Sequence, residues 1–336
     1  MTTIIYHRSD PDGWFSNTVA RKFLPEDTQS IGWEYNDPVP EIPPEGDIYM
    51  VDISVAALLD DPALRSRIVW IDHHKTAIEK WDVAPHNHGD QDAPPPFRGV
   101  RIDGVAACRL CWWFFQMQSI DPAETLRSPH PSFLPERIDW SRRQSGEPEV
   151  LFLVGLRDVW KHEGTRDEWA CNTLNLSLVA RQDDEELRQH LIDQEDEDSA
   201  APGVTVGSLC DQGSAIQRYA YSLNAEHAVR GGMIRRWRGL TWAVLNSQAK
   251  GNQTLAAWAQ LRSEVIDGLL VWSVGAGGKV NVSLYHAPGQ KDHDLSLIAK
   301  AMGGGGHPGA CGFQADLDWA LDLVRAMPLA AQPPMP

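Results

Sequence analysis

The chain of 336 residues exceeds the usual size of a single hydrophobic core, so the sequence predicts two domains. It has no apolar run approaching about 18 residues and no basic N-terminal segment, so we expect neither a membrane span nor a signal peptide, and a cytoplasmic location. Proteins that bind along long nucleic acids neutralise the phosphates with a stripe of basic residues. The net charge of −16 therefore favours a short or small phosphorylated substrate and argues against a long duplex.

In the first half of the chain, short apolar runs alternate with stretches whose apolar residues recur at helical spacing. The expected strands lie within residues 2–13, 30–37, 47–54, 68–71 and 149–160. The expected helices cover residues 14–24, 56–66, 104–116 and 183–193. This alternation indicates an α/β fold with a doubly wound, mainly parallel sheet. The polar and Pro-rich residues 86–97 and 128–149 predict exposed loops.

In the second half, an acidic run at residues 195–203 predicts a solvated linker, followed by a connecting helix at 217–229. Strands are expected within residues 238–247, 268–275 and 279–286, with helices near 255–261 and at 295–301. A short helix and a frayed tail at 332–336 would follow. We therefore expect a second, smaller α/β domain. The predicted bounds are 1–195 for the first domain, 196–231 for the linker and connecting helix, and 232–330 for the second domain.

Acids and histidines follow four of the apolar runs in the first half. They are His7, Asp10, Asp12, Asp52, Asp72, His73, His74 and Asp158. Because ligands gather beyond the carboxyl ends of strands in an open α/β sheet, we expect one site there. Each acid alone could instead cap a helix or a turn, but a set of this size is hard to explain in that way.

Carboxylates and imidazoles without cysteine suit divalent ions such as Mn²⁺ or Mg²⁺. Crowded acids would repel one another in the absence of metal, and two cations would remove this repulsion, with Asp52 as a possible bridge. Two metals about 4 Å apart can clamp a phosphate and hold a bridging hydroxide for in-line attack. Cys108 and Cys111 lie three residues apart on one apolar helical face, which favours core packing over metal or redox chemistry.

A glycine run follows the last long helix, within GGGGHPGACGF at residues 303–313. Four glycines could form a flexible linker, but this run is flanked by an apolar helix and an apolar strand. Glycines permit close backbone approach, and their amides can cradle a phosphate, so we favour ligand binding.

Together these motifs resemble the DHH phosphoesterases that carry a C-terminal DHH-associated domain. That family includes RecJ-type exonucleases, nanoRNases that also dephosphorylate adenosine bisphosphate, and cyclic-dinucleotide phosphodiesterases. The resemblance rests on HRSDPDG, VDIS, DHH, LRDVW and LIAKAMGGGGHPGACGF. It implies that the first domain is catalytic and that the second, DHH-associated domain binds substrate.

The resemblance also implies two Mn²⁺ sites that share one bridging carboxylate. One site would consist of His7, Asp10 and Asp52. The other would consist of Asp12, Asp52, His73 and Asp158. Asp72 would orient a ligand histidine, and His74 would face the scissile phosphate as a charge stabiliser or proton donor. A terminal phosphate or nucleotide would be gripped across the interdomain cleft by Gly303, Gly304, Gly305, Gly306 and His307.

The implied activity is that of a Mn²⁺-dependent phosphodiesterase that hydrolyses short oligonucleotides or dinucleotides. A homodimer is compatible with this activity. A phosphomonoesterase acting on adenosine bisphosphate and a polyphosphate hydrolase are alternatives that would use the same metals. A non-catalytic nucleic-acid binding module is a further alternative, although such a module needs no second metal site. The chain departs from the family at two places. The first motif is one residue shorter between His7 and Asp10, and Tyr285 and His286 stand where many members carry an arginine.

Overall fold

The computed structural model describes residues 1–35, 37–81, 97–120, 138–194, 204–248, 266–275, 277–287, 289–290 and 292–325. The chain divides into two compact units, Met1–Ser214 and Ala215–Pro336. Several expectations lie outside the described residues: residues 86–96 and 128–137 of the two exposed loops, the acidic linker at 195–203, the helix near 255–261 and the tail at 332–336. The predicted domain bounds of 1–195, 196–231 and 232–330 stay predictions.

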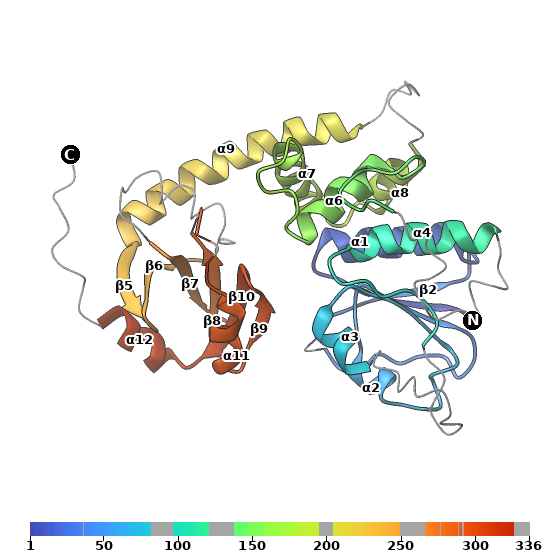
Figure 1. The fold of residues 1–336 in the computed structure, drawn as a ribbon, viewed down its shortest axis with the longest axis horizontal. Helices are drawn as coiled ribbons and strands as arrows, with labels where there is room; N and C mark the ends of the chain where they lie inside the picture. Colours follow the sequence, from blue (N-terminus) through green and yellow to red (C-terminus); the bar gives the residue numbers. More distant parts are fainter. Residues whose placement is uncertain are drawn as a thin grey trace. The chain divides into compact units, whose positions relative to one another are not determined.

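The first unit contains a four-stranded sheet in which every pairing is parallel (Figure 1). Its strands are β1 (Thr3–His7), β2 (Gln29–Trp33), β3 (Ile48–Val51) and β4 (Ile68–Ile71). They are arranged in the order β2-β1-β3-β4. The order reverses between β1 and β3, and at such a switch point the carboxyl ends of the strands leave room for a ligand.

Helices cover both faces of this sheet, as Figure 1 shows for α1 and α4 on one side and α2 and α3 on the other. The helices of the first unit are α1 (Pro11–Phe23), α2 (Ala56–Leu59), α3 (Lys75–Trp81), α4 (Ala107–Ile120), α6 (Glu149–Asp158), α7 (Glu168–Ala180) and α8 (Glu185–Asp193). Neighbouring residues along β1, β3 and β4 enter opposite cores: in β1, Ile4 packs with α1 and α4, and Ile5 packs with α2. Burial on both faces explains the continuous apolar strands. The predicted doubly wound, parallel sheet is confirmed.

Residues 149–160, predicted as a strand, form helix α6 instead. Val150 to Leu156 are all buried, so the helix has no polar face in this stretch. A short apolar run that is buried on every side carries no periodicity, and its sequence does not separate a strand from a buried helix. The prediction of a strand was therefore wrong, although Asp158 still lies at the carboxyl end of the element.

The second unit contains a six-stranded mixed sheet in the order β5-β6-β7-β8-β10-β9. Its strands are β5 (Met233–Trp237), β6 (Leu240–Asn246), β7 (Gly268–Val274), β8 (Val280–His286), β9 (Gly305–His307) and β10 (Ala310–Ala315). Helices α11 (Leu295–Ala301) and α12 (Leu317–Arg325) pack on one face of this sheet, and Ala228 of α9 packs on the other. Helix α9 (Val206–Gly231) runs through the boundary between the units. A smaller α/β domain was predicted for this half of the chain.

All five cysteines are buried with free thiols, and Cys108 and Cys111 belong to the core of the first unit. Burial raises the pKa of both thiols well above the usual value, which removes nucleophilic thiolate at neutral pH. Among the helices in the described ranges, none is long and apolar enough to cross a membrane.

Candidate metal centre

The structure brings the predicted acids and histidines of the first unit together at the carboxyl ends of β1, β3, β4 and α6. Two sets of three residues place one ligand atom each within 4.8 Å of one another. The first set is His7, Asp10 and Asp52. The second set is Asp12, His73 and Asp158. A third set, Asp52 with His73 and His74, meets the same criterion, so Asp52 connects the two halves of the cluster.

The turn between β1 and α1 positions the first set. Nδ1 of His7 lies 2.8 Å from Oδ2 of Asp10 and 3.6 Å from Oδ2 of Asp52. Asp10 is the N-cap of α1 and accepts a hydrogen bond from the Gly13 amide at 3.0 Å, while Pro11 begins the helix. A Cβ at Gly13 would lie 1.9 Å from the His7 carbonyl oxygen, so this turn requires glycine.

Helix α4 fixes one member of the second set. Both carboxylate oxygens of Asp12 accept hydrogen bonds from the first amides of α4, Ala107 at 2.8 Å and Cys108 at 2.7 Å. The amino end of a helix favours negative charge, which explains a buried acid here. Nε2 of His73 lies 3.5 Å from Oδ2 of Asp12 and 3.3 Å from Oδ2 of Asp158.

Asp52 stands between the two sets in an unusual backbone conformation. Its φ angle is +58°, a left-handed value that residues other than glycine seldom adopt. One carboxylate oxygen approaches His7, and the other lies 3.3 Å from Nε2 of His73. Strain of this kind persists where the surrounding structure imposes it and is common at functional sites.

Asp72 anchors the loop that carries both histidines. It is fully buried and accepts hydrogen bonds from Nε1 of Trp70 at 3.0 Å and from the amides of His73 and His74 at 2.7 and 3.1 Å. Its Oδ1 also lies 2.6 Å from Nδ1 of His74. The carboxylate therefore orients His74, and no direct contact with the His73 ring is seen in the described residues. Burial opposes ionisation of Asp72, but its bonds to His74 prevail and lower its pKa.

Two buried oxygens of the cluster, Asp52 Oδ1 and Asp158 Oδ2, accept no hydrogen bond from the described residues. Buried acceptors of this kind are rare and require a partner. A divalent cation would provide one, and a donor set of carboxylate oxygens and imidazole nitrogens suits Mn²⁺ or Mg²⁺. The residues present thus fit a metal.

The pKa values of several groups in the cluster are shifted from their usual values. Burial and the charge of Asp52 raise the pKa of Asp12 to about 7, and burial and the charge of Asp12 raise that of Asp158 to about 7. Burial opposes the charged form of His7, but its contacts with Asp10 and Asp52 raise its pKa to about 11. The contacts of His74 with Asp72 likewise outweigh burial and raise its pKa to about 9. Without a metal, bound protons reduce the repulsion among the crowded acids.

Sequence reasoning missed two residues that follow β2. Oε2 of Glu34 lies 3.4 Å from Nε2 of His7. The Tyr35 ring is half-exposed, with its centroid 6.0 Å from that of His7 and 6.4 Å from that of His74. Because β2 pairs in parallel with β1, its carboxyl end lies at the same edge of the sheet. This pairing was the available signal.

In the second unit, the predicted glycine run and His307 form the turn and edge strand before β10. A Cβ at Gly304 would lie 2.0 Å from the Gly312 carbonyl oxygen, and Gly306 has a φ of +128°, so the backbone itself requires both glycines. A Cβ at Gly305 would meet no atom within 4 Å. Binding of a phosphate by Gly303, Gly304, Gly305, Gly306 and His307 stays a prediction.

The two residues that replace a family arginine occupy different environments. Tyr285 packs against the apolar cluster on the face that contacts α9. Nε2 of His286 lies 2.6 Å from the carbonyl oxygen of His293. The His286 ring is therefore held by the chain itself.

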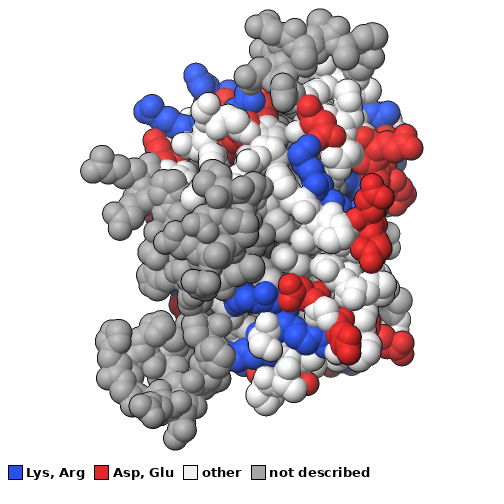
Figure 2. All heavy atoms as spheres, turned by 90° about the vertical axis from the view of Figure 1, so that its right-hand side faces the viewer, with Lys and Arg blue, Asp and Glu red and all other residues white. Residues whose placement is uncertain are grey.

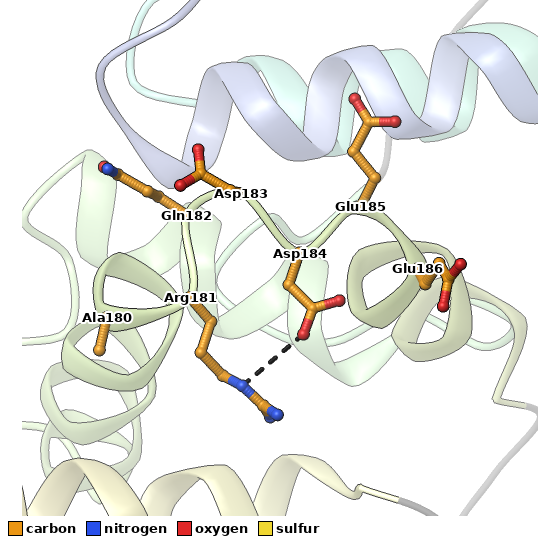
Figure 3. Close-up of a pocket in the computed structure, with 7 residues that line it drawn as sticks. All are labelled: Ala180, Arg181, Gln182, Asp183, Asp184, Glu185 and Glu186. Atoms are coloured by element: carbon orange, nitrogen blue, oxygen red, sulfur yellow. Dashed lines mark ion pairs between the residues drawn. The ribbon is translucent and has the colours of Figure 1, made fainter.

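A surface hollow lies elsewhere in the first unit, at the turn between α7 and α8 (Figure 3). Residues 180–186 line it, and Arg181 and Asp184 point toward one another with Nε and Oδ2 3.7 Å apart. It includes none of the predicted site residues, and its acids are those of an exposed helix start.

No protein-family model matches the chain, and no curated protein matches it. Three solved structures illustrate what its fold is similar to. A pGpG-specific phosphodiesterase from Vibrio cholerae is 14% identical over 96% of both chains, with a TM-score of 0.42. The DHH domain of a protein described as a member of the s1p family of ribosomal proteins is 11% identical over 96% of this chain and 84% of that one, with a TM-score of 0.45. RecJ from Thermus thermophilus in complex with Mn²⁺ is 12% identical over 96% of this chain and 50% of that one, with a TM-score of 0.44. The structures similar to this chain thus include DHH-domain proteins, the family that its motifs resemble.

Proposed function

We propose that the protein is a phosphoesterase that works with two divalent cations. The observation that supports this most directly is the pair of ligand sets joined by Asp52, whose buried oxygen Oδ1 has no hydrogen-bond donor among the described residues. Bound cations would supply an activated nucleophile and neutralise the charge of the phosphate. The first ion would be held by His7, Asp10 and Asp52. The second would be held by Asp12, Asp52, His73 and Asp158.

In this proposal His74 donates a proton or a positive charge to the phosphate. Asp72 occupies its Nδ1, which leaves Nε2 for the substrate. The raised pKa of about 9 keeps the ring protonated at neutral pH. A positioned imidazolium can protonate the leaving oxygen or stabilise its developing charge.

We further propose short oligonucleotides or dinucleotides as substrates, with Mn²⁺ as the metal. The half-exposed Tyr35 ring beside His74 offers a surface on which a base can stack, which a polyphosphate would not use. Figure 2 shows acidic and basic side chains interspersed on one face, without a continuous basic stripe among the residues drawn in colour. Imidazole ligands beside the carboxylates favour Mn²⁺ over Mg²⁺.

A hydrolysis screen tests the proposal. Dinucleotides to pentanucleotides, adenosine bisphosphate, cyclic dinucleotides and polyphosphate are incubated with Mn²⁺, with Mg²⁺ and with neither. We expect metal-dependent cleavage of the shortest oligonucleotides, which Asp52→Asn abolishes and the exposed acid variant Asp183→Asn retains. Failure of a Mn²⁺-loaded protein to cleave any of these compounds would contradict the proposal.

The aromatic contact has its own test on the same substrates. Tyr35→Ala should raise KM for a dinucleotide, because the stacking surface is lost, whereas Tyr35→Phe keeps the ring and should behave like the wild type. An equal KM for all three proteins would remove the support that Tyr35 gives to a nucleotide substrate.

The predicted homodimer and the cytoplasmic location belong to the proposal as well. Light scattering of the purified chain measures the first, and fractionation of cells that express it measures the second.

A further inference from the structure

Among the described residues, the guanidinium of Arg157 has no hydrogen-bond or ion-pair partner, and it lies beside the candidate metal centre. Arg157 immediately precedes Asp158 at the end of α6, and its buried Nε–H has no acceptor among the described residues. Within the described ranges, no carboxylate or carbonyl oxygen forms a hydrogen bond or an ion pair with this side chain. Its side chain is not fully buried, and its two terminal nitrogens are not among the buried atoms that lack a partner, so we infer that they are accessible to solvent.

In other buried arginines of the first unit, terminal guanidinium nitrogens have hydrogen-bond acceptors. Arg109 pairs with Glu147 through two hydrogen bonds of 2.5 and 3.0 Å and donates to the Trp140 carbonyl at 2.6 Å. Arg101 donates to the carbonyl of Trp70 at 2.8 Å. Arg157 therefore differs from the arginines that serve the packing of this unit.

The charge of Arg157 lies close enough to acids of the candidate centre to interact with them. The negative charges of Asp158 and Asp10 act on the guanidinium, although neither acid forms a salt bridge with it. Burial lowers the pKa of the neighbouring His162, and the charge of Arg157 lowers it further, so that imidazole stays neutral. Within the described residues, the guanidinium is thus the one cation beside the cluster whose charge is not neutralised by a contact. It also keeps this charge at every pH near neutrality.

A largely buried cation without a partner is unfavourable, because burial removes water and no protein group replaces it. Acids whose charge is offset by bound metal ions neutralise a neighbouring guanidinium less. An anion that enters the site from solvent can do so. The planar, forked guanidinium matches a phosphate with two parallel hydrogen bonds, which an ammonium group does not.

We propose that Arg157 binds the non-bridging oxygens of the phosphate that the metal centre acts on, and equally the phosphate product. This inference rests on the proposed function, since it names a residue that grips the reacting group. Arg157 and His74 would contact the phosphate from different elements, α6 and the loop after β4. The positive charge of Arg157 would also offset the charge that develops as the phosphate reacts.

Binding of inorganic phosphate to the Mn²⁺-loaded, full-length protein tests this inference without turnover. Tm is followed first against Mn²⁺ and then, with Mn²⁺ saturating, against phosphate. Arg157→Met should keep the shift caused by Mn²⁺, because no ligand is lost, and should weaken phosphate binding at least tenfold. Arg157→Lys should fall between the two proteins, because it keeps the charge and loses the fork.

Arg166→Met is the matched control, because the Arg166 side chain is 93% exposed and lies nine residues along the chain. It should bind phosphate as the wild type does. The inference is overturned if the wild type shows no phosphate shift, or if Arg157→Met and Arg166→Met bind phosphate equally. Loss of the Mn²⁺ shift in both Arg157 variants would also overturn it, since Arg157 would then support the centre itself. If Arg157→Met does not fold, the comparison of Arg157→Lys with the wild type decides.

Turnover separates this inference from the proposed function. If phosphate binding depends on Arg157 but no phosphoester is hydrolysed, the inference stands and the proposed function fails. If hydrolysis is found, Arg157→Met should lower kcat/KM about 100-fold, as expected for one lost contact to the charge of the transition state. Hydrolysis that Arg157→Met leaves unchanged would keep the proposed function and refute the inference.

Discussion

The left-handed backbone of Asp52 separates the conformational role of this residue from its chemical role. A side chain with a Cβ is strained at a φ of +58°, whereas glycine is not. Asp52→Ala and Asp52→Gly both remove the carboxylate, but only the glycine variant also removes the strain.

We therefore expect the metal-free Asp52→Gly protein to be more stable than Asp52→Ala by about 1 kcal/mol, with both inactive. Denaturant unfolding in the presence of a chelator measures the difference. Equal free energies of unfolding would mean that the conformation carries no strain. Activity in either variant would exclude Asp52 as a bridging ligand.

Proton competition at single residues predicts how metal binding depends on pH. The pKa values of Asp12 and Asp158 are raised to about 7, so these carboxyls are largely protonated below pH 7 and become better ligands above it. His7, with a pKa of about 11, must also release its proton to bind. Mn²⁺ affinity should therefore rise steadily from about pH 6 to pH 8, with protons released on binding.

Calorimetry at pH 7 in two buffers with different ionisation enthalpies measures that release, and titrations at several pH values measure the affinity. The exposed Asp183→Asn variant should show the same pH dependence as the wild type. An affinity that is constant over this range, with no proton release, would show that the acids are already ionised.

At the scale of elements, the turn from β1 to α1 has no room for a side chain at Gly13. A Cβ there would lie 1.9 Å from the His7 carbonyl oxygen, so Gly13→Ala must displace either His7 or the start of α1. We expect a loss of more than about 2 kcal/mol in the free energy of unfolding, together with weaker Mn²⁺ binding.

Gly305→Ala is the control, because its Cβ would meet no atom within 4 Å and its φ is not positive. It should change stability by less than about 0.5 kcal/mol. Thermal and denaturant unfolding of the two variants compare them directly. Similar losses in both would indicate that the β1–α1 turn adapts to a side chain.

The elements also show what the sequence could reveal. Strands β1, β3 and β4 were predictable because apolar β-branched runs end in polar residues, and parallel strands bring those ends together. Residues 149–160 were misread as a strand because an apolar run buried on all sides has no period, although Asp158 stands at the end of the helix as it would at the end of a strand. Helix α7 (Glu168–Ala180) was not predicted.

Single residues were hidden from the sequence for a different reason. Glu34, Tyr35 and Arg157 belong to common residue types in ordinary surroundings, and their meaning depends on which neighbours lack or provide a partner. The pairing of β2 with β1 gives Glu34 and Tyr35 their place, and the absence of an acceptor among the described residues distinguishes Arg157. Only the folded chain shows these contacts.

At the scale of the whole molecule, charge limits the length of a substrate. The chain carries a net charge of −16, and the face in Figure 2 intersperses acids with bases. Each further phosphate beyond those held at the metal centre would meet little compensating charge. We expect turnover to fall as oligonucleotides lengthen beyond a few residues.

Steady-state kinetics on a series of single-stranded oligonucleotides from two to about twenty residues, at two salt concentrations, check this expectation. Because binding of short substrates needs few phosphate contacts, their KM should depend weakly on salt. Equal or better turnover of the longest strand would instead favour a processive exonuclease.

Asp12 joins the metal centre to a helix that contributes no metal ligand of its own. Its carboxylate accepts hydrogen bonds from the first two amides of α4. The start of that helix therefore depends on the same group that would hold a cation. Metal occupancy and the opening of this helix end are then thermodynamically coupled, and each must influence the other. The amides of Ala107 and Cys108 should exchange with deuterium more slowly when Mn²⁺ is bound, while amides of β8 in the second unit keep their rates. Unchanged exchange at both amides in the Mn²⁺-bound protein would show that the two are not coupled. Amide exchange in the first turn of α4 would therefore report whether metal is bound at the centre, without any substrate.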